Sequence, residues 1–410
     1  MYRPDLRSVT IAAGLIALTG AGPVVAHDIS LYPSVKGGEW RRTENLKDTQ
    51  GRFQARQEHT ALEANGFVYV INGFVPQQPP PTPTEEDPEP FPFKPTNEML
   101  VYVPAGDPAA PESPRGQWRV LDRSSWFPKD DYHHMMAVQH GGRIWALGGH
   151  NGVRFFPANT VYVYSPVSRT DPNGSWTAIE DDGSPCDAAV GCLTLPEPRA
   201  AGAAVSLGDT IYVLGGVVFN QGATDPNETI RATNSVLALN TSRTPHRWEV
   251  APPMIDEREH FNAAVLGGRI WVFHGRNGRT THLRGVESWA PGEAAWRREP
   301  DAPVGTSANI LAAVGDCVYS FGGEFNANNV TGTVTASQVF HVPTRTWRLV
   351  EPTFAKQPYD ASGVTSKHGT YGLVFEEQGQ KKIMAPGGAS TAWFDPMSRV
   401  HVFVPPADCR

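Results

Sequence analysis

The sequence lacks the marks of several large functional classes, and each absence narrows what the protein does. Acidic residues outnumber lysine and arginine by 42 to 35, and the basic residues form no cluster, so a nucleic-acid partner is not expected. The Gly-x-Ser-x-Gly motif of many serine hydrolases is missing. No glycine pair leads into a readable helix, which argues against a phosphate-binding loop. After the N-terminal segment, no apolar run is long enough to cross a bilayer.

The N-terminal segment has the composition of a secretory signal peptide. Arginines precede an apolar stretch over 9–18, and small residues come just before His27. Glycines interrupt the stretch, so a retained membrane anchor is the less favoured alternative. We therefore predict a signal peptide over 1–26 and a single mature domain over 27–410 that is secreted or periplasmic, with no membrane span after signal removal.

Cysteine is scarce, with four residues in the whole chain. Cys186 and Cys192 enclose a short loop and are predicted to form a disulfide, because an exported chain meets an oxidising compartment. Cys317 and Cys409 would tie down the C-terminal tail if they paired. A buried free thiol at Cys317 is an equally open alternative, since free cysteine packs as a small hydrophobe.

A short apolar run that ends in a glycine pair, or in a close variant of one, occurs six times. The second glycines are spaced 48 to 76 residues apart and stand at Gly73, Gly149, Gly216, Gly275, Gly323 and Gly388. Five copies carry an aromatic residue four positions earlier: Tyr69, Trp145, Tyr212, Trp271 and Tyr319. The sixth copy has Met384 there instead. Self-similarity at this period indicates a repeat architecture.

Each unit has further features of β-strands. An apolar strand precedes the glycine run, and alternating segments such as 98–104, 160–166 and 337–343 follow the glycine pairs, each bounded by proline. A tryptophan then opens a fourth strand, at Trp118, Trp176, Trp248, Trp296 and Trp347. Four strands per unit are typical of a propeller blade.

These marks resemble the kelch-repeat family. The segment from Arg258 to Arg276 carries the family's leading Arg-x-His and ends its apolar run at His274-Gly275, and the resemblance extends over about residues 38–404. It implies an all-β, six-bladed kelch β-propeller. We expect the protein to be a monomer. The sequence departs from the pattern at Asn72, at His274 and throughout the sixth unit.

A ring of blades must cover its last edge strand. The sixth unit lacks a late tryptophan and has a candidate third strand at 391–396, whereas a spare tryptophan, Trp40, lies near the N-terminus. We predict that an N-terminal strand over 39–44 closes the ring. The alternative is closure by the strand 399–404.

A proline-rich acidic insertion over 76–95 interrupts the first unit. Its prolines exclude a strand there and favour polyproline II or a solvated loop. A lid or a docking arm for a partner is the functional alternative.

Aligning the units on their glycine pairs places His134 and His260 at the same position of the innermost strand, with His59 one residue out of register. Three histidines facing one channel could in principle hold a metal. They come from different blades, however, so we expect each to hydrogen-bond blade backbone and predict neither a metal site nor a cofactor.

Polar loops after the glycine pairs are expected to surround one mouth of the ring. Arginine in such a mouth would bind the carboxylate of an acidic sugar in a bidentate manner. The predicted ligand-binding residues are Asn151, Arg154, Arg258, Arg276, Asn277, Arg279, His134 and His260. The predicted partner is accordingly a small molecule, with a carbohydrate as the favoured class, or another protein.

Two enzyme classes with a kelch ring supply alternatives. A resemblance to sialic acid mutarotases implies cofactor-free sugar chemistry, in which Glu324 with Arg276 or Arg258 would act at the sugar ring. A copper radical oxidase of the galactose oxidase type is disfavoured, because no cysteine precedes Cys186 and only Tyr132-His133 resembles its copper ligands.

Overall fold

The structure is a computed structural model of the whole chain. It describes residues 29–84, 91–107, 116–152, 155–168, 170–186, 192–222, 229–278, 281–324, 332–351, 366–391 and 395–409. The predicted signal peptide and two of the predicted ligand-binding residues, Arg154 and Arg279, lie outside these ranges.

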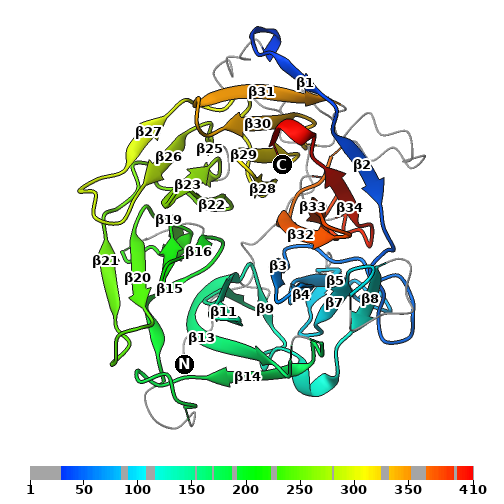
Figure 1. Cartoon of the computed structure of the whole chain (residues 1–410). Helices are drawn as coiled ribbons and strands as arrows, with labels where there is room; N and C mark the ends of the chain where they lie inside the picture. Colours follow the sequence, from blue (N-terminus) through cyan, green and yellow to red (C-terminus); the bar gives the residue numbers. More distant parts are fainter. Residues whose placement is uncertain are drawn as a thin grey trace.

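The described residues form an all-β propeller, as predicted, with sheets arranged around a central axis (Figure 1). Five of these sheets each have a four-stranded core built from one continuous unit. In chain order their strands are β3 (Thr60–Ala64), β4 (Phe67–Ile71), β7 (Leu100–Val103) and β8 (Gln117–Val120); β10 (Met136–His140), β11 (Arg143–Leu147), β13 (Phe156–Pro166) and β14 (Gly174–Ala178); β16 (Ala203–Leu207), β17 (Thr210–Leu214), β20 (Val236–Asn240) and β21 (Trp248–Ala251); β22 (Asn262–Leu266), β23 (Arg269–Phe273), β26 (Val286–Trp289) and β27 (Arg297–Glu299); and β28 (Ile310–Val314), β29 (Cys317–Phe321), β30 (Ser337–His341) and β31 (Thr346–Glu351).

The remaining four-stranded sheet joins the two ends of the chain. Its strands are β32 (Leu373–Glu377), β33 (Gln380–Ala385), β34 (His401–Val404) and β2 (Glu39–Arg42). The antiparallel pairing of β2 with β34 places Trp40 opposite Phe403 and closes the ring. Closure by the N-terminal strand is thus confirmed. The predicted third strand at 391–396 is wrong, because β34 takes that place; Thr391 and Pro396 belong to no strand, and 392–394 lie outside the described residues.

Further short strands lie outside the four-stranded cores. They are β1 (Ser34–Lys36), parallel to β31; the ribbons β5 (Phe74–Pro76) with β6 (Phe93–Pro95), β18 (Val217–Phe219) with β19 (Ile230–Ala232), and β24 (Arg276–Asn277) with β25 (Thr281–His282); β12 (His150–Asn151) between β9 (Tyr132–His133) and β13; and β15 (Thr194–Arg199) on β13. Helical turns are limited to η2 (Ile29–Leu31), η3 (Arg123–Ser125) and η6 (Ala407–Cys409). Among the described residues, no helix has the length and apolarity needed to span a membrane.

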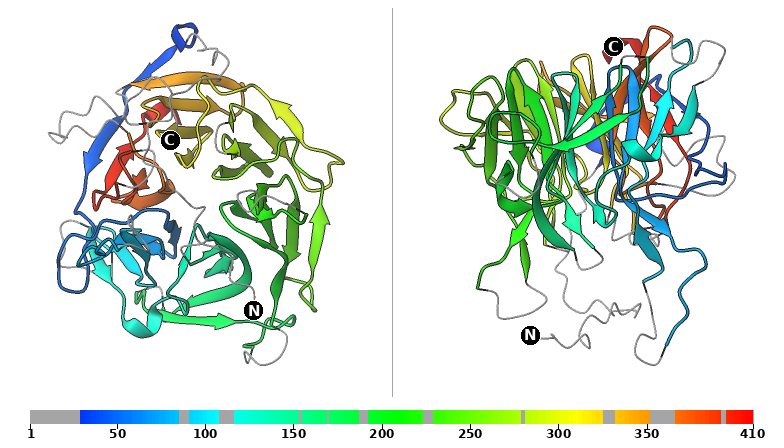
Figure 2. Two further views of the ribbon diagram at one scale, coloured as in Figure 1. Left: turned by 180° about the vertical axis from the view of Figure 1, so that it is seen from behind. Right: turned by 90° about the horizontal axis from the view of Figure 1, so that it is seen from below.

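The ends of the proline-rich insertion are strands, which corrects the expectation that prolines exclude β-structure there. Phe74–Pro76 pairs antiparallel with Phe93–Pro95, and the prolines occupy the last position of each strand of this two-stranded ribbon. Phe91 packs on Phe74 and on Phe93, with ring centroids 5.4 and 5.6 Å apart. The ribbon extends beyond one face of the ring (Figure 2).

The axis of the ring is lined by a closed cycle of backbone hydrogen bonds. The amide of one residue in each unit donates to the carbonyl of its counterpart in a neighbouring unit, over 2.7 to 3.0 Å. In the order of donation the members are His134, Glu58, Gly369, Ala308, His260 and Ala201, which donates to His134. All six have a positive φ, between 48° and 62°. The prediction that His134 and His260 hold the same position in their units is confirmed. In the first unit this position belongs to Glu58, the residue before His59.

The glycine pairs follow from backbone conformation. Both residues of each pair have a positive φ, and the second reaches 89° to 114°. At Gly73 a side chain would bring its Cβ within 2.6 Å of the Gln57 carbonyl oxygen, so only glycine fits. Asn72 and His274 replace the first glycine of their pairs. Their φ angles are 56° and 62°, in a region that residues other than glycine enter at a cost.

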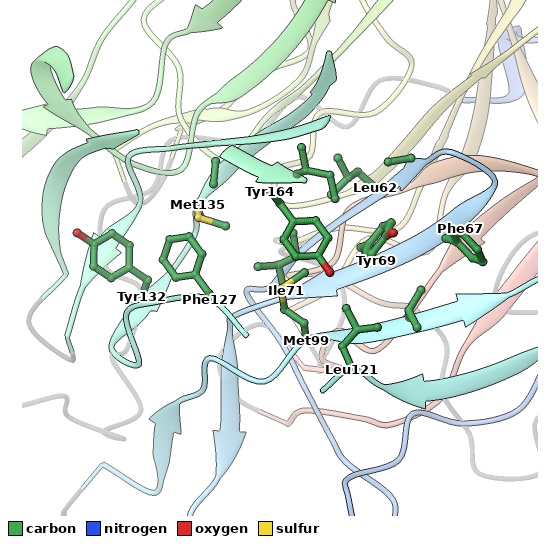
Figure 3. Close-up of a cluster of buried hydrophobic side chains, with 14 of the residues drawn as sticks. Leu62, Phe67, Tyr69, Ile71, Met99, Leu121, Phe127, Tyr132, Met135 and Tyr164 are labelled. Atoms are coloured by element: carbon green, nitrogen blue, oxygen red, sulfur yellow. The ribbon is translucent and has the colours of Figure 1, made fainter. Parts of the chain in front are cut away.

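Each core lies between two neighbouring blades. Figure 3 shows the interface of the first two, where Tyr69 and Tyr164 meet with ring centroids 5.8 Å apart above Met99 and Leu121. Five further clusters join the remaining pairs of neighbouring blades. The repeated aromatics four residues before the second glycine, and Met384 in the sixth unit, all lie in these clusters.

Both cysteine pairs form disulfides. Cys186–Cys192 encloses a sequence separation of 6 residues, as predicted, and Cys317–Cys409 spans 92 residues. The second bridge fixes the C-terminal tail to the inner sheet strand β29, so the free-thiol alternative for Cys317 does not apply.

We expect Trp40→Ala to destabilise the ring at its closure. Trp40 is 3% exposed and packs on Phe321 and Phe403, with ring centroids 4.7 and 5.1 Å away. Truncation of such a buried tryptophan costs about 3–5 kcal/mol. Urea unfolding measures the loss, with Phe53→Ala, an exposed aromatic at 71%, as the control expected to stay within about 0.5 kcal/mol. Similar losses in the two variants would contradict closure by Trp40.

Loop length predicts unequal contributions from the two disulfides. Their sequence separations of 6 and 92 residues correspond to loop-closure terms of about 2 and about 4–5 kcal/mol. Replacement of both cysteines of a pair by serine, followed by denaturant unfolding, should therefore cost more for Cys317–Cys409 than for Cys186–Cys192. The opposite ranking would show that chain entropy does not govern these bridges.

Candidate functional site

Polar side chains gather where the axial residues meet. Glu58, His134 and His260 each place a ligand-type atom within 4.8 Å of the other two, and Glu58, Glu324 and His368 do the same. We call these five residues the axial cluster. Glu58, His134, Glu324 and His368 are buried, and His260 is partly buried.

A second layer of pairings explains why loop residues reach the axis. In every unit, the residue after the glycine pair bridges to the residue just before the axial residue. The pairs are Gln57–Phe74, His133–His150, Ala200–Val217, Glu259–Arg276, Ser307–Glu324 and His368–Ala389. Three of these pairs carry charged side chains, and two of the other three carry aromatic or imidazole rings. The mouth of the ring is therefore polar on one side and ring-lined on the other.

Arg276 is the centre of the polar side. Its Nε donates to Glu259 Oε1 over 2.6 Å, its Nη1 donates to Glu324, and its Nη2 lies 3.4 Å from His260 Nδ1. The side chain retains 17% exposure. One guanidinium thus bridges two carboxylates on neighbouring blades.

Electrostatics keep Glu324 ionised. Burial raises its pKa, but Arg276 and His368 together lower the pKa to about 2. For His368, burial lowers the pKa, but Glu324, with Nδ1 and Oε1 3.1 Å apart, together with Glu58 and the carbonyl of Thr391, raises the pKa above its usual value. Glu324 and His368 therefore form a buried ion pair.

The ring-lined side consists of stacked imidazole and phenyl groups. The ring centroid of Phe155 lies 4.8 Å from His133, 5.8 Å from His134 and 5.4 Å from His150. Burial lowers the pKa of both His133 and His150 well below the usual value, and neighbouring His134 adds to the effect. These two histidines are consequently neutral.

No family model matches the chain. Kelch-like protein terF of Aspergillus terreus is 23% identical over 405 residues, which cover 97% of this chain and 74% of the relative. The "Kelch repeat and BTB domain-containing protein 2" of cowpox virus, strain GRI-90, is 26% identical over 146 residues, and that of ectromelia virus is 32% identical over 126 residues. These matches cover 36% and 28% of the chain and only 24% and 22% of the viral proteins.

The chain is a kelch-repeat protein. The relative that matches nearly the whole chain carries the name, every unit has a four-stranded sheet, and five of the six units carry the buried aromatic before the glycines. The kelch fold alone says nothing of a ligand, so function rests on the side chains at the mouth.

The kelch ring brings together four of the residues expected at the mouth: His134, His260, Arg276 and Glu324. Asn151 in β12 and Asn277 in β24 are exposed on the ribbons that follow the glycine pairs. His59 lies apart, with Nε2 3.3 Å from the Thr370 hydroxyl.

Arg258 does not reach the mouth. It is fully buried inside its blade, where it pairs with Glu287 over 2.5 Å and donates to the carbonyls of His274 and Gly285. Arg56, Arg199 and Lys367 hold the same position in their units and also donate to backbone carbonyls. The leading arginine of the kelch pattern is structural in this chain.

The expectation that the axial histidines bond blade backbone is wrong. His134 Nε2 lies 2.9 Å from Glu58 Oε2, and His260 Nδ1 contacts the Glu259 carboxylate. Sequence reasoning missed Glu58, Glu259 and His368. Glu58 was detectable, because it aligns with His134 and His260.

Two hollows on the described surface lie away from the axial cluster. One of about 500 Å³ is lined by residues that include Asp48 and Trp126, and one of about 150 Å³ by residues that include His140 and His246. Neither includes a residue of the cluster.

The buried pair predicts a pH-dependent cost for His368→Gln. The folded-state pKa of His368 is raised above 6.5, so its stabilisation is complete below pH 6.5 and is lost as the pH rises through that raised value. Glu324, with its pKa lowered from 4.5 to about 2, loses its contribution only as the pH falls toward 2. Removal of one partner of a buried pair costs about 3–5 kcal/mol.

Unfolding free energies of wild type and His368→Gln between pH 5 and pH 9 test this. The difference should be largest near pH 5 to 6 and decline above it, whereas His341→Gln, at the surface beside Thr344, should show no such trend. A difference that is constant with pH would contradict the charged state of His368.

Proposed function

We propose that the protein binds a small polar ligand, a carbohydrate, at the mouth of the kelch ring. One observation carries the proposal: an aromatic wall around Phe155 and an ionic wall around Arg276 meet at the axis, where the rings of His134 and His260 lie 4.8 Å apart. Ligand sites commonly combine apolar surface with a few convergent polar groups.

The ionic wall suits hydroxyl groups. A sugar hydroxyl both donates and accepts, so it can bridge the carboxylates of Glu259 and Glu324 and the guanidinium of Arg276 without breaking their contacts. Hydrogen bonds to charged partners are the stronger ones. The exposed amides of Asn151 and Asn277 extend this polar surface along the ribbons.

The aromatic wall suits the apolar face of a sugar ring. Phe155 is only half-buried and is held by His133, His150 and Phe74, the last with ring centroids 6.0 Å away. A held aromatic surface offers contact area at a small cost in entropy.

Neutral sugars fit this mouth better than the acidic sugar expected from the sequence. Arg276 is already paired with two carboxylates. A ligand carboxylate would approach Glu58, Glu259 and Glu324, and like charges at short range are unfavourable.

The charge balance also argues against Glu324 as a general acid, since its pKa is about 2. A mutarotase-like activity therefore has less support than binding.

Export to an extracellular or periplasmic compartment is part of the proposal. Two disulfides are compatible with an oxidising compartment. A carbohydrate ligand outside the cytosol is consistent with a mouth at which Phe155 and Arg276 stay partly exposed.

The proposal predicts that neutral sugars raise the melting temperature of the full chain and bind in isothermal titration. A ligand at about 100 times its Kd stabilises by about 2.7 kcal/mol. Galactose, glucose, mannose and their oligosaccharides serve as probes beside glucuronic and sialic acid. Phe155→Ala should weaken binding about 10-fold or more, equivalent to about 1.4 kcal/mol, while Phe53→Ala, outside the mouth, should leave it unchanged.

Absence of binding by every sugar would overturn the proposal and move the search to a protein partner. Tighter binding of the acidic sugars would contradict the argument from charge. Equal loss in Phe155→Ala and Phe53→Ala would place the ligand elsewhere on the ring.

A further inference from the structure

The axial cluster contains two triads that share Glu58, and the two differ in what their histidines can do. We propose that Glu58, His134 and His260 form a binding site for a divalent transition-metal cation on the axis of the ring. The proposal can be tested without the sugar ligand, because all three metal ligands come from the chain itself.

The three residues are preset by the fold. All belong to the closed cycle of backbone hydrogen bonds, so each backbone is fixed at the axis. A ligand-type atom of each lies within 4.8 Å of the others, and His134 Nε2 is already 2.9 Å from Glu58 Oε2. Two imidazoles and one carboxylate are a common ligand set for zinc and for other first-row metals.

The ring of His134 is held in place by its neighbour His133. His133 Nε2 lies 3.0 Å from the carbonyl oxygen of Gly152, so this nitrogen donates to it. The other ring nitrogen of His133, Nδ1, contacts Nδ1 of His134. The His134 ring is therefore held through Nδ1 and presents Nε2 to Glu58.

With Nδ1 held by His133, Nε2 is the ligand atom of His134. It lies 2.9 Å from Glu58 Oε2, so a cation at the axis would be within reach of both atoms after small side-chain shifts.

His260 is likewise held through Nδ1. That nitrogen contacts the carboxylate of Glu259 and lies 3.4 Å from Nη2 of Arg276. These outer contacts occupy Nδ1 and leave Nε2 as the ligand atom of His260. Metal-bound histidines commonly have a carboxylate, a carbonyl or another polar group at their other ring nitrogen. Both axial histidines therefore have the outer partners of metal ligands.

The histidine of the second triad has both ring nitrogens engaged. His368 Nε2 contacts the carbonyl oxygen of Thr391, so it carries a proton, and Nδ1 lies 3.1 Å from Glu324 Oε1 and serves that carboxylate. Arg276 further neutralises Glu324. The cation is accordingly assigned to the triad of Glu58, His134 and His260.

Three protein ligands leave a coordination position free. In zinc sites this arrangement leaves room for a water or a ligand oxygen. The free position would be available to a molecule bound at the mouth.

Titration of the untagged full chain with Zn²⁺ tests the site. The expected result is one ion per chain, with an affinity that falls as the pH is lowered, because protons compete for the ligands. Glu58→Gln, which is nearly isosteric, and His134→Ala should each weaken binding at least 10-fold. Glu259→Gln should weaken it by about 10- to 100-fold as an outer partner. His341→Ala, at the surface, is the matched control and should bind like wild type.

Cobalt provides a second readout. Co²⁺ bound by the triad should give a visible absorption spectrum in the wild type that Glu58→Gln and His134→Ala lack, while circular dichroism confirms that both variants are folded. No Zn²⁺ binding by the wild type, or unchanged binding by both variants, would overturn the proposal. Because neither measurement includes a sugar, its outcome is separate from that of the sugar titrations.

Discussion

The closed cycle of backbone hydrogen bonds on the axis is the constraint on which the rest of the structure depends. It requires one residue of every unit to adopt a positive φ at the same place. Glycine would meet this requirement without strain, yet only Gly369 does so. Glu58, His134 and His260 hold the same conformation at a cost, as Ala201 and Ala308 do, so the cycle itself does not require their ionisable side chains.

The same cycle explains how residues from separate blades meet. His134 and His260 belong to blades that are not adjacent, and the axial residue between them is Ala201. Because alanine is small, their rings approach across it to 4.8 Å. The two remaining axial residues, Ala308 and Gly369, are also small, and Glu324 and His368 from the second layer come within reach of Glu58. Small residues on one part of the cycle thus make room for ionisable groups from another.

Local features of the chain could be predicted from the sequence because they have local causes. Consecutive positive φ values require the glycine pairs, and inter-blade packing requires the aromatic four residues earlier. Even the closing strand was detectable from a single spare tryptophan, Trp40. The axial cluster could not be detected in this way. Aligning the repeats shows which residues hold equivalent positions but not how far those residues lie from the axis of the ring. Blades converge toward the axis, so the argument that spread-out histidines cannot meet failed there.

The composition of the cluster is difficult to explain by stability. Burying carboxylates and imidazoles carries a desolvation penalty, and replacement of buried ion pairs by apolar side chains is often neutral or stabilising. The third unit shows that the fold accepts such a replacement, since Ala201 occupies the cycle and Ala200 and Val217 pair in the second layer. Ionisable residues at the equivalent positions of other units are therefore not needed to build the ring. Their convergence on one end of the axis, opposite an aromatic wall, is the arrangement expected of a site that binds something.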